Sequence, residues 1–546
     1  MLLSLPLGTA RHWLAHKKVR NTFATLSLMG GLGGCSLPQL PISEPELALE
    51  PTAAHATRLG QSIMPWTHAH PGLSGIYPLA DAADAFAVRF NLMAQAQCSL
   101  DVQYYIWRAD SSGLLLLQAL YEAANRGVKV RLLLDDNGTR NLDHLLYGLS
   151  LHPNIEVRLF NPFVIRRPKS IGFLFDFKRL NRRMHNKSFT VDNTVTIIGG
   201  RNIGDEYFGG TETVSFADLD VMAIGAVVPQ VSADFDRYWN HQSAYPIEIL
   251  LNARNLIADN EVQRRSYALD FEYLLNKNPQ QTKNFLHTIQ ESAIVDELLT
   301  GYLDLHWVKT EMVSDDPDKI LGLAPQEELL PYQLQRAIGT PQHSVDLISP
   351  YFVPTQTGVE AFSALIKQNG VRVRVLTNSY DATDVAVVHA GYIKHRKQLL
   401  QAGVELFELR KIHAEKRSLP ERVKRRLRQP IGFSGSSLHA KTFAVDGKRL
   451  FVGSFNFDPR SALLNTELGF VIHSPELAQQ VSALFDHDIP VLSYQVILST
   501  DHRLRWIERY PVEHTPFALH EVEPNTTLFD RFWLGFLSRL PIEWML

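Results

Sequence analysis

Two copies of one pattern of reactive side chains stand out in this sequence. In each copy a histidine is followed two positions later by a lysine and five positions after that by an aspartate; the residues are His185, Lys187, Asp192, His439, Lys441 and Asp446. An imidazole and an ammonium suit a phosphate group, because they supply a nucleophile or acid and a fixed positive charge. One copy alone could arise by chance, whereas two copies with similar surroundings indicate a duplicated half-site.

A glycine-rich segment that ends in asparagine follows each copy, Gly199–Asn202 in the first half and Gly453–Asn456 in the second. Alternating apolar residues predict a β-hairpin at each motif, with the motif aspartate at the turn and the asparagine after the returning strand. Histidine and lysine, two apart on a strand, then leave the same face. We expect Asn202, Asn456 and Ser454 to bind substrate. A turn aspartate is as ordinary in a structural role as in a catalytic one, so both roles stay open for the motif aspartates.

The duplication extends beyond the two motifs. Ser99–Val102 matches Ser344–Leu347, Arg126–Arg131 matches Asn369–Arg374, and Val231–Asp236 matches Val481–Asp486, in the same order. A helical pattern lies between the first two landmarks of each half, so each half begins strand, helix, strand. This order is typical of α/β layers with helices on both faces of a mixed sheet. We predict two duplicated α/β lobes, packed as a pseudo-twofold pair around one shared cleft.

The length and composition suit this architecture. The chain has 546 residues, of which 45% are hydrophobic and 20% charged, enough for two lobes and additional segments. The expected division is a first lobe at residues 71–245, an inter-lobe helical connection at 246–335, a second lobe at 336–490 and a C-terminal extension at 491–546.

The amino terminus predicts export and a lipid anchor. Basic residues precede a short apolar stretch, and residues 32–35, Leu-Gly-Gly-Cys, have the form of a bacterial lipoprotein processing site. The stretch is too short to span a bilayer. We expect a signal peptide at residues 1–35, lipidation of Cys35 and a tether at 36–70. The protein would then be held on a membrane of the bacterial envelope, facing the periplasm. The alternative is an uncleaved leader that associates with the membrane.

The paired motifs closely resemble the phospholipase D superfamily, over roughly residues 71–490. Within it, the strings GGRNIGDEYF at Gly199–Phe208 and LPIEW at Leu540–Trp544 are similar to the C-type branch of the bacterial cardiolipin synthases. The resemblance implies the superfamily fold. It also implies a carboxylate downstream of each motif that orients the opposing histidine, and the matching positions are Asp220 and Glu467.

The resemblance implies phosphodiester exchange through a phosphohistidine. One neutral histidine attacks phosphorus, while the other, protonated, donates to the leaving alcohol and then takes the proton of the incoming one. The near symmetry leaves open which histidine is the nucleophile. Phosphatidylglycerol with a second phosphatidylglycerol, or with phosphatidylethanolamine, would give cardiolipin. No metal-binding motif or cofactor signature accompanies these residues.

Other functions remain as alternatives. If water were the acceptor, the protein would be a phospholipase D-type hydrolase. A nuclease comes third, because a net charge of −3 and a pI near 6.7 provide no overall clamp for nucleic acid. From another class, the chain could be a membrane-tethered scaffold without chemistry, although two intact motifs argue against that. The oligomeric state is open.

Two further segments predict contact with a lipid surface. Residues 163–183 combine phenylalanine and leucine with arginine and lysine, which suits apolar insertion beneath anionic headgroups. Residues 528–540 are apolar and aromatic, with Arg531 and Arg539 on one flank of a helix. The alternatives are a solvated loop for the first segment and a core-packing terminal helix for the second.

Overall fold

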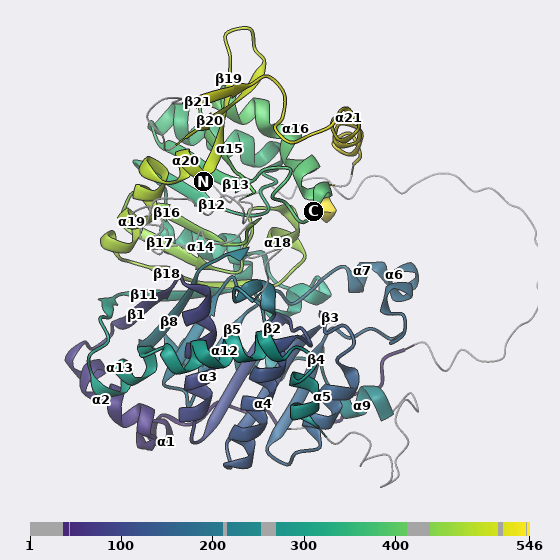
Figure 1. Ribbon diagram of the computed structural model, residues 1–546, viewed down its shortest axis with the longest axis vertical. Coiled ribbons are helices and arrows are strands. Elements are labelled where there is room, and N and C mark those ends of the chain that lie inside the picture. The colour runs from purple at the N-terminus through teal and green to yellow at the C-terminus, as the bar shows by residue number, and fades with distance from the viewer. Residues whose placement is uncertain are drawn as a thin grey trace, which may run out of the picture.

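The computed structural model describes residues 36–42, 44–210, 216–252, 269–411, 437–510, 517–541 and 543–546. The expected signal peptide and Cys35 therefore lie outside the described residues. Figure 1 shows two halves stacked along the long axis, the first in purple to teal and the second in green to yellow. In each half, helices cover a mixed sheet.

The sheet of the first half has nine strands in the order β10-β1-β8-β6-β5-β2-β3-β4-β9. The central strands β2, β3 and β4 are parallel, and the other neighbours are antiparallel. Parallel neighbours need crossover connections, which helices α4 (Ser111–Asn125) and α5 (Asp143–Ser150) provide. The bounds are β1 Ser74–Leu79, β2 Ser99–Ile106, β3 Lys129–Gly138, β4 Ile155–Phe160, β5 Ser188–Val191, β6 Val195–Gly199, β8 Asp220–Gly225, β9 Ala244–Pro246 and β10 His306–Val308.

The sheet of the second half repeats this order, with one strand fewer at one edge and two more at the other. Its ten strands run β11-β18-β17-β16-β12-β13-β14-β19-β20-β21, and β12, β13 and β14 are parallel. The bounds are β11 Thr310–Ser314, β12 Ser344–Ile348, β13 Arg372–Asn378, β14 Glu405–Leu409, β16 Thr442–Val445, β17 Arg449–Gly453, β18 Leu468–Ile472, β19 Ser493–Leu498, β20 Leu504–Arg509 and β21 Phe517–His520. The prediction of two duplicated α/β lobes with mixed sheets is confirmed.

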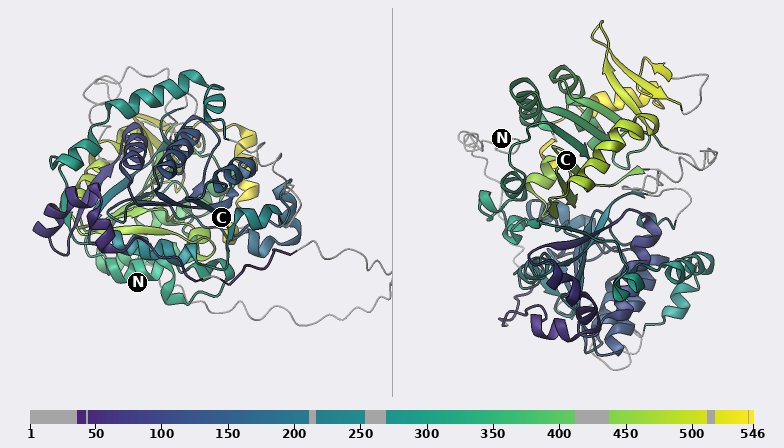
Figure 2. Two further views of the ribbon diagram at one scale, coloured as in Figure 1. Left: turned by 90° about the horizontal axis from the view of Figure 1, so that it is seen from below. Right: turned by 90° about the vertical axis from the view of Figure 1, so that its left-hand side faces the viewer.

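Helices cover both faces of each sheet (Figures 1 and 2). Those of the first half and the connection are α1 Pro51–Ala56, α2 Arg58–Ala69, α3 Ala82–Gln95, α4 Ser111–Asn125, α5 Asp143–Ser150, α6 Gly172–Phe175, α7 Phe177–Leu180, α8 Val228–Trp239, α9 Ile247–Asn252, α11 Phe271–Leu275, α12 Pro279–Glu291 and α13 Ile294–Thr300. Those of the second half are α14 Leu330–Ile338, α15 Thr355–Asn369, α16 Ala386–Ala402, α18 Pro459–Leu463, α19 Pro475–His487, α20 Ile489–Leu492 and α21 Leu528–Leu537. Among the described residues, none of the helices has the length and apolar content needed to cross a bilayer.

One hydrophobic cluster joins the two halves. It combines Ile198 and Val221 of the first sheet with Val452 and Phe470 of the second, and all four side chains are buried. Helices α8 and α19 contribute to the same cluster through residues such as Val231 and Val481. Because apolar burial is the main stabilising term in a protein core, this cluster holds the two sheets in a fixed relation.

Three segments differ from the sequence expectation. The expected tether is helical from Pro51 to Ala69, because Leu59 and Ile63 of α2 bury against the first lobe. The expected helical connection also contributes strands β10 and β11, one to each sheet. These strands are too short for a clear alternating pattern. The C-terminal extension adds β19, β20 and β21 to the second sheet before α21.

Candidate active site

The two motifs lie on equivalent β-hairpins. β5 and β6 pair around a turn at Asp192 and Asn193, and β16 and β17 pair around a turn at Asp446 and Gly447. All four turn residues have positive φ, between 49° and 57°. Such turns match the right-handed twist of the flanking strands and favour Asn, Asp and Gly. Each hairpin therefore presents its histidine at the open end, away from the turn.

The motif aspartates stand at the wrong end of the hairpin for catalysis. Asp192 accepts hydrogen bonds from the backbone N–H groups of residues 97, 98 and 99, and Asp446 accepts them from residues 342, 343 and 344. A four-residue strand, about 13 Å long, separates each aspartate from its histidine. The inclusion of Asp192 and Asp446 among the catalytic residues is corrected: they tie each hairpin to the start of the neighbouring strand.

Each histidine pairs with a carboxylate from the other half. His185 Nδ1 lies 2.8 Å from Glu467 Oε2, and His439 Nδ1 lies 2.5 Å from Asp218 Oδ2. The backbone also makes hydrogen bonds between the halves. His185 N–H donates to the Thr466 carbonyl at 2.9 Å, and His439 N–H donates to the Ala217 carbonyl at 2.8 Å.

Short parallel pairings position both contacts. Strand β7, Phe216–Ala217, pairs with β15, Ser437–Leu438, and the following residues of the two strands are Asp218 and His439. A single bridge between Met184 and Thr466 acts in the same way for the next pair, His185 and Glu467. The two halves thus cross at the site, and each histidine receives its carboxylate from the other lobe.

Asp220 is not the carboxylate that orients His439, so this sequence expectation was wrong by two residues. Asp220 pairs with Gly199 in the first sheet, as Gly469 pairs with Gly453 in the second. Asp220 therefore corresponds to Gly469, and the residue that corresponds to Glu467 is Asp218. Instead, Asp220 accepts a 2.7 Å hydrogen bond from Arg89 and lies 3.5 Å from the Arg201 guanidinium, in a buried ion cluster.

Ser454 lies behind Glu467 and is not among the residues that line the cavity, which corrects its assignment to substrate binding. Its hydroxyl donates to Glu467 Oε2 at 2.5 Å, and Ser461 donates to Glu467 Oε1 at 2.8 Å. The equivalent residue in the first half is Gly200. A Cβ at Gly200 would lie 2.1 Å from Asp218 Oδ1, so glycine is required there to admit the carboxylate.

The pKa values of the two carboxylates, Glu467 and Asp218, are shifted in opposite directions. Burial raises the pKa of Glu467 to about 7, against the charge of Lys187 and the hydrogen bonds from the two serines. Burial would also raise the pKa of Asp218, but its hydrogen bond to His439 and the nearby charges outweigh burial and lower the pKa to about 2. Asp218 is therefore ionised at neutral pH, whereas Glu467 is poised to hold a proton.

The histidines and lysines of the motifs are buried together. Burial, with the charges of Lys187 and Lys441, holds the pKa of His185 well below its usual value, and burial also lowers the pKa of His439. Burial lowers the pKa of Lys187 to about 7 and that of Lys441 to about 8. Each ammonium donates to the carbonyl of its own histidine, at 2.6 Å for Lys187 and 2.5 Å for Lys441.

A cavity of about 580 Å³ lies over both histidines. Asn202 and Asn456 line it, and Asn456 Oδ1 is a buried atom without a hydrogen-bond partner. Apolar groups and Arg460 share the lining with the polar centre. Such a mixture suits an anionic group attached to apolar chains.

Sequence reasoning missed two aromatic supports. Tyr105 and Tyr207 line the cavity and meet the histidine rings edge-on, with centroids 4.9 Å apart for Tyr105 and His185 and 5.2 Å for Tyr207 and His439. Both tyrosines lie close in sequence to predicted strands or motif residues, but no spacing rule relates them to the histidines. Only the folded arrangement shows that each ring is held at its edge.

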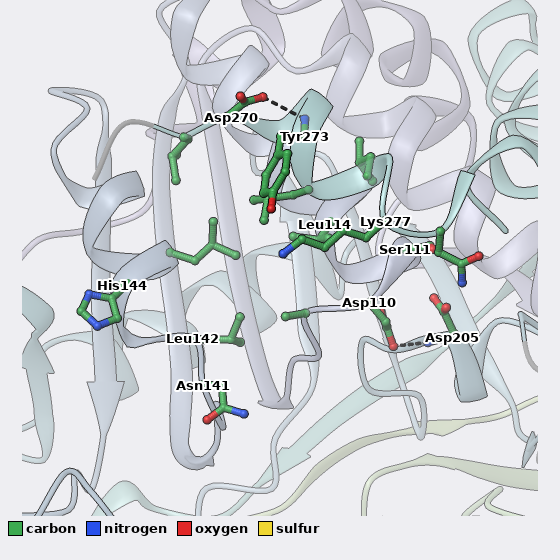
Figure 3. A pocket seen from close by; sticks show the side chains of 16 residues that line it. Asp110, Ser111, Leu114, Asn141, Leu142, His144, Asp205, Asp270, Tyr273 and Lys277 are labelled. Atoms are coloured by element: carbon green, nitrogen blue, oxygen red, sulfur yellow. Dashed lines mark hydrogen bonds between the residues drawn. The ribbon is translucent and has the colours of Figure 1, made fainter. Parts of the chain in front are cut away.

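A second hollow, of about 470 Å³, lies on the first lobe (Figure 3). It contains Asp110 and Asp205, and burial together with Asp110 raises the pKa of Asp205 to about 6. It shares no lining residue with the histidine cavity, and the Arg108–Glu206 ion pair, at 3.3 Å, belongs to the lining of that other cavity. The paired motif histidines therefore lie at the cavity between the lobes and not at this hollow.

Paired hairpins, crossed histidine–carboxylate contacts and one shared cavity define a two-lobed phosphodiester-processing enzyme. The profile of the family described as "Cardiolipin synthase, PLD-like domain" matches residues 90–239 and 334–489, one match in each lobe. The chain belongs to this family, and thus to the phospholipase D superfamily.

Among curated relatives, cardiolipin synthase C of Escherichia coli (strain K12) is 47% identical over 489 residues, which cover 90% of this chain and 100% of the relative. An uncharacterized protein of Helicobacter pylori (strain ATCC 700392 / 26695) is 31% identical, over 92% of this chain and 95% of the relative. Among solved structures, a phosphatidylserine synthase of Haemophilus influenzae Rd KW20 aligns with a TM-score of 0.48 and 15% identity, over 78% of this chain and 90% of that one.

Proposed function

We propose that this protein makes cardiolipin by transferring a phosphatidyl group from one phospholipid to the hydroxyl of phosphatidylglycerol. The donor is a second phosphatidylglycerol or phosphatidylethanolamine, and no cofactor takes part. The observation that carries the proposal is the pair of histidines, each held by a carboxylate of the other lobe, beneath one cavity. The 47% identity to a protein named cardiolipin synthase C supports the choice of reaction.

His439 is the nucleophile in this proposal. If Nδ1 donates its proton to Asp218, Nε2 keeps the lone pair that attacks phosphorus once Lys441 Nζ, 3.2 Å from Nε2, turns to the phosphate. The resulting N-phosphoryl imidazole carries positive charge, which the ionised Asp218 stabilises at 2.5 Å. As the new N–P bond forms, the P–O bond to the donor headgroup breaks.

His185 is the acid in the same proposal. Glu467, with a pKa of about 7, can hold a proton against Nδ1 of His185, so that Nε2 carries an N–H directed at substrate. That proton passes to the leaving glycerol or ethanolamine while the proton on Glu467 moves to Nδ1, so that His185 stays neutral and Glu467 becomes a carboxylate. The hydroxyl of phosphatidylglycerol then gives its proton to His185 and attacks phosphorus, which breaks the N–P bond and releases cardiolipin and unmodified His439.

The remaining site residues have supporting roles in this proposal. Lys187 and Lys441 place positive charge beneath the reacting phosphate, and Asn202 and Asn456 bind its nonbridging oxygens from the cavity wall. We propose further that Cys35 carries lipid and that the enzyme works on a membrane at the periplasmic side. Phosphodiester exchange needs no nucleotide, which suits that compartment.

Lipid mass spectrometry on purified protein in phosphatidylglycerol vesicles, with and without phosphatidylethanolamine, tests the proposal. We expect cardiolipin with wild type and none with His185→Ala or His439→Ala. Isotope labelling of the phosphatidylethanolamine chains identifies the donor. Phosphatidic acid as the sole product would instead make the protein a hydrolase, and no lipid turnover would overturn the proposal.

A further inference from the structure

Exposed apolar side chains gather at two places on one side of the molecule. The first-lobe patch consists of Leu174, Phe175 and Phe177 on α6 and α7, with exposed fractions of 81%, 80% and 41%. The second-lobe patch consists of Leu528, Phe529, Phe532, Trp533 and Phe536 on α21, the first three exposed by 72% or more. Figures 1 and 2 show α6, α7 and α21 projecting from the same side as the C-terminus.

Neither patch is needed to hold its helix on the protein. α21 packs on Ala390 of α16 through Leu534 and Leu537, and its aromatic residues occupy the opposite face. In α6, Phe173 meets Phe163 with ring centroids 5.4 Å apart, while Leu174 and Phe175 remain exposed. Each helix thus has a second apolar face that no described residue covers.

Both patches connect directly to the histidine cavity. Arg460 lines the cavity and donates to the Asn181 side chain at 2.7 Å, immediately after α7. Its backbone N–H donates to the Leu546 carbonyl at 2.7 Å, and Met545 and Leu546 also line the cavity. On the other side, α16 contributes Val388 to the cavity wall and supports α21. The patches therefore flank one edge of the cavity.

The charges around the patches favour an anionic surface. Arg167 and Lys178 are exposed beside the first-lobe patch, and Arg539 is exposed beyond the end of α21. The nearby carboxylates are engaged: Asp176 accepts from Arg179 at 2.6 Å, and Asp530 accepts from Thr527 in the capping box of α21. Exposed tryptophan beside basic side chains is typical of segments that lie at the headgroup level of a bilayer.

We propose that the two patches are a two-point docking surface for an anionic bilayer, which turns the histidine cavity toward the lipid headgroups. The proposal rests on the proposed function only in taking the substrate to be a membrane lipid. Apolar side chains of both patches enter the interface, and the basic residues contact anionic headgroups. Because one patch belongs to each lobe, contact at both sets the tilt of the cavity as well as its distance from the membrane.

Two measurements test the docking surface. Hydrogen–deuterium exchange of the full chain, with and without vesicles of phosphatidylethanolamine and phosphatidylglycerol, should show protection of α6, α7 and α21 and no change at α13. Vesicle flotation compares Leu174→Asp and Phe532→Asp, each in a Cys35→Ser background that prevents lipid attachment. We expect each substitution to weaken partitioning about tenfold. The matched control is Tyr302→Asp, an equally exposed residue next to α13.

Activity assays separate docking from chemistry. The docking variants should lose turnover on vesicles but keep it on short-chain phosphatidylglycerol dispersed as monomers. If wild type turns over neither substrate, the proposed function fails, while the flotation result still decides the docking surface. Equal partitioning of Phe532→Asp and Tyr302→Asp would overturn the proposal. So would protection of α21 that depends on protein concentration and not on lipid, because a second copy of the chain would then cover it.

Discussion

The two half-sites share one backbone plan but differ in the carboxylate that each histidine receives. His439 faces Asp218, which has a pKa of about 2 and is ionised, whereas His185 faces Glu467, which has a pKa of about 7. Burial prevails at Glu467, although the hydrogen bonds from Ser454 and Ser461 lower its pKa, whereas at Asp218 the contact with His439 and the nearby charges outweigh burial. Duplicated geometry thus supports two different proton states, which an acid and a nucleophile require.

The largest effect should come from the histidines themselves. His185→Ala and His439→Ala should each lower kcat by about a thousandfold or more. If His439 is the nucleophile, His185→Ala still forms a phosphatidyl adduct with a donor that has a good leaving group, such as a nitrophenyl ester. Intact-protein mass spectrometry after rapid quench detects that adduct. An adduct on His439→Ala and none on His185→Ala would reverse the assignment.

The carboxylates should differ in importance. In the proposed mechanism Asp218→Asn removes the charge that stabilises phospho-His439, and we expect kcat/KM to fall by about a thousandfold. Glu467→Gln keeps a polar partner for His185 and should cost about ten- to a hundredfold. Steady-state kinetics with cardiolipin detection measures both, and Asp220→Asn controls for loss of a buried carboxylate outside the site. Equal losses at positions 218 and 467 would argue against distinct roles.

The pH profile should show the proton held by Glu467. The pKa of about 7 is raised above the ordinary value, so the pair is protonated below pH 7 and loses its proton above it. The kcat/KM value should therefore fall as the pH rises through about 7, and Lys187, also near 7, acts in the same direction. Ser454→Gly removes a hydrogen bond that lowers the pKa of Glu467. The fall of kcat/KM on the alkaline side of the profile, its alkaline limb, should therefore move to higher pH.

The reciprocal change is the control for that experiment. Gly200→Ser would place a Cβ 2.1 Å from Asp218 and push the carboxylate away from His439. This variant should lose activity at every pH without moving the alkaline limb. A limb that stays in place in Ser454→Gly would show that Glu467 does not set it.

The smallest effect on activity should come from the motif aspartates. Asp192→Ala leaves three backbone N–H groups without their partner and should lower the free energy of unfolding by about 2–3 kcal/mol. Asp446→Ala should cost less, because its donors at residues 342 and 343 lie at the surface. Denaturant unfolding measures both, and kcat per folded molecule should stay within about threefold of wild type. A loss comparable to that of a histidine variant would restore a catalytic role.

Much of the fold could be predicted from the sequence because the duplication repeats local signals. Alternating apolar residues and turn residues specify each hairpin, and the matched landmarks order the strands of both lobes. The helices α1 and α2 were missed because a Pro- and Ala-rich composition resembles a tether, while the burial of Leu59 depends on a distant surface. The burial of α2 depends on first-lobe residues far along the chain, which the composition of the segment does not show.

The site was harder to predict where two neighbouring aspartates, Asp218 before β8 and Asp220 at its start, compete for one role. Asp218 and Asp220 are only two positions apart, so the distance from the motif does not tell which one meets His439. The strand register decides it, through the pairing of Gly199 with Asp220 and of Gly453 with Gly469. A comparison of the strings Asp-Leu and Glu-Leu at 218 and 467 would have found the right residue. For the turn aspartates the sequence left a structural and a catalytic role open, and their contacts with residues 97–99 and 342–344 favour the structural one.

The pairing of β7 with β15 and the bridge between Met184 and Thr466, which bring each histidine to a carboxylate of the other half, constrain how the two halves can evolve. A substitution in one repeat alters the partner of a histidine encoded about 220 to 280 positions away, since 218 pairs with 439 and 185 with 467. Neither repeat can be replaced, inherited or expressed separately without removing both carboxylate contacts. An ancestor with one repeat per chain would have needed a second copy to complete either contact, and fusion then allowed aspartate and glutamate to diverge independently.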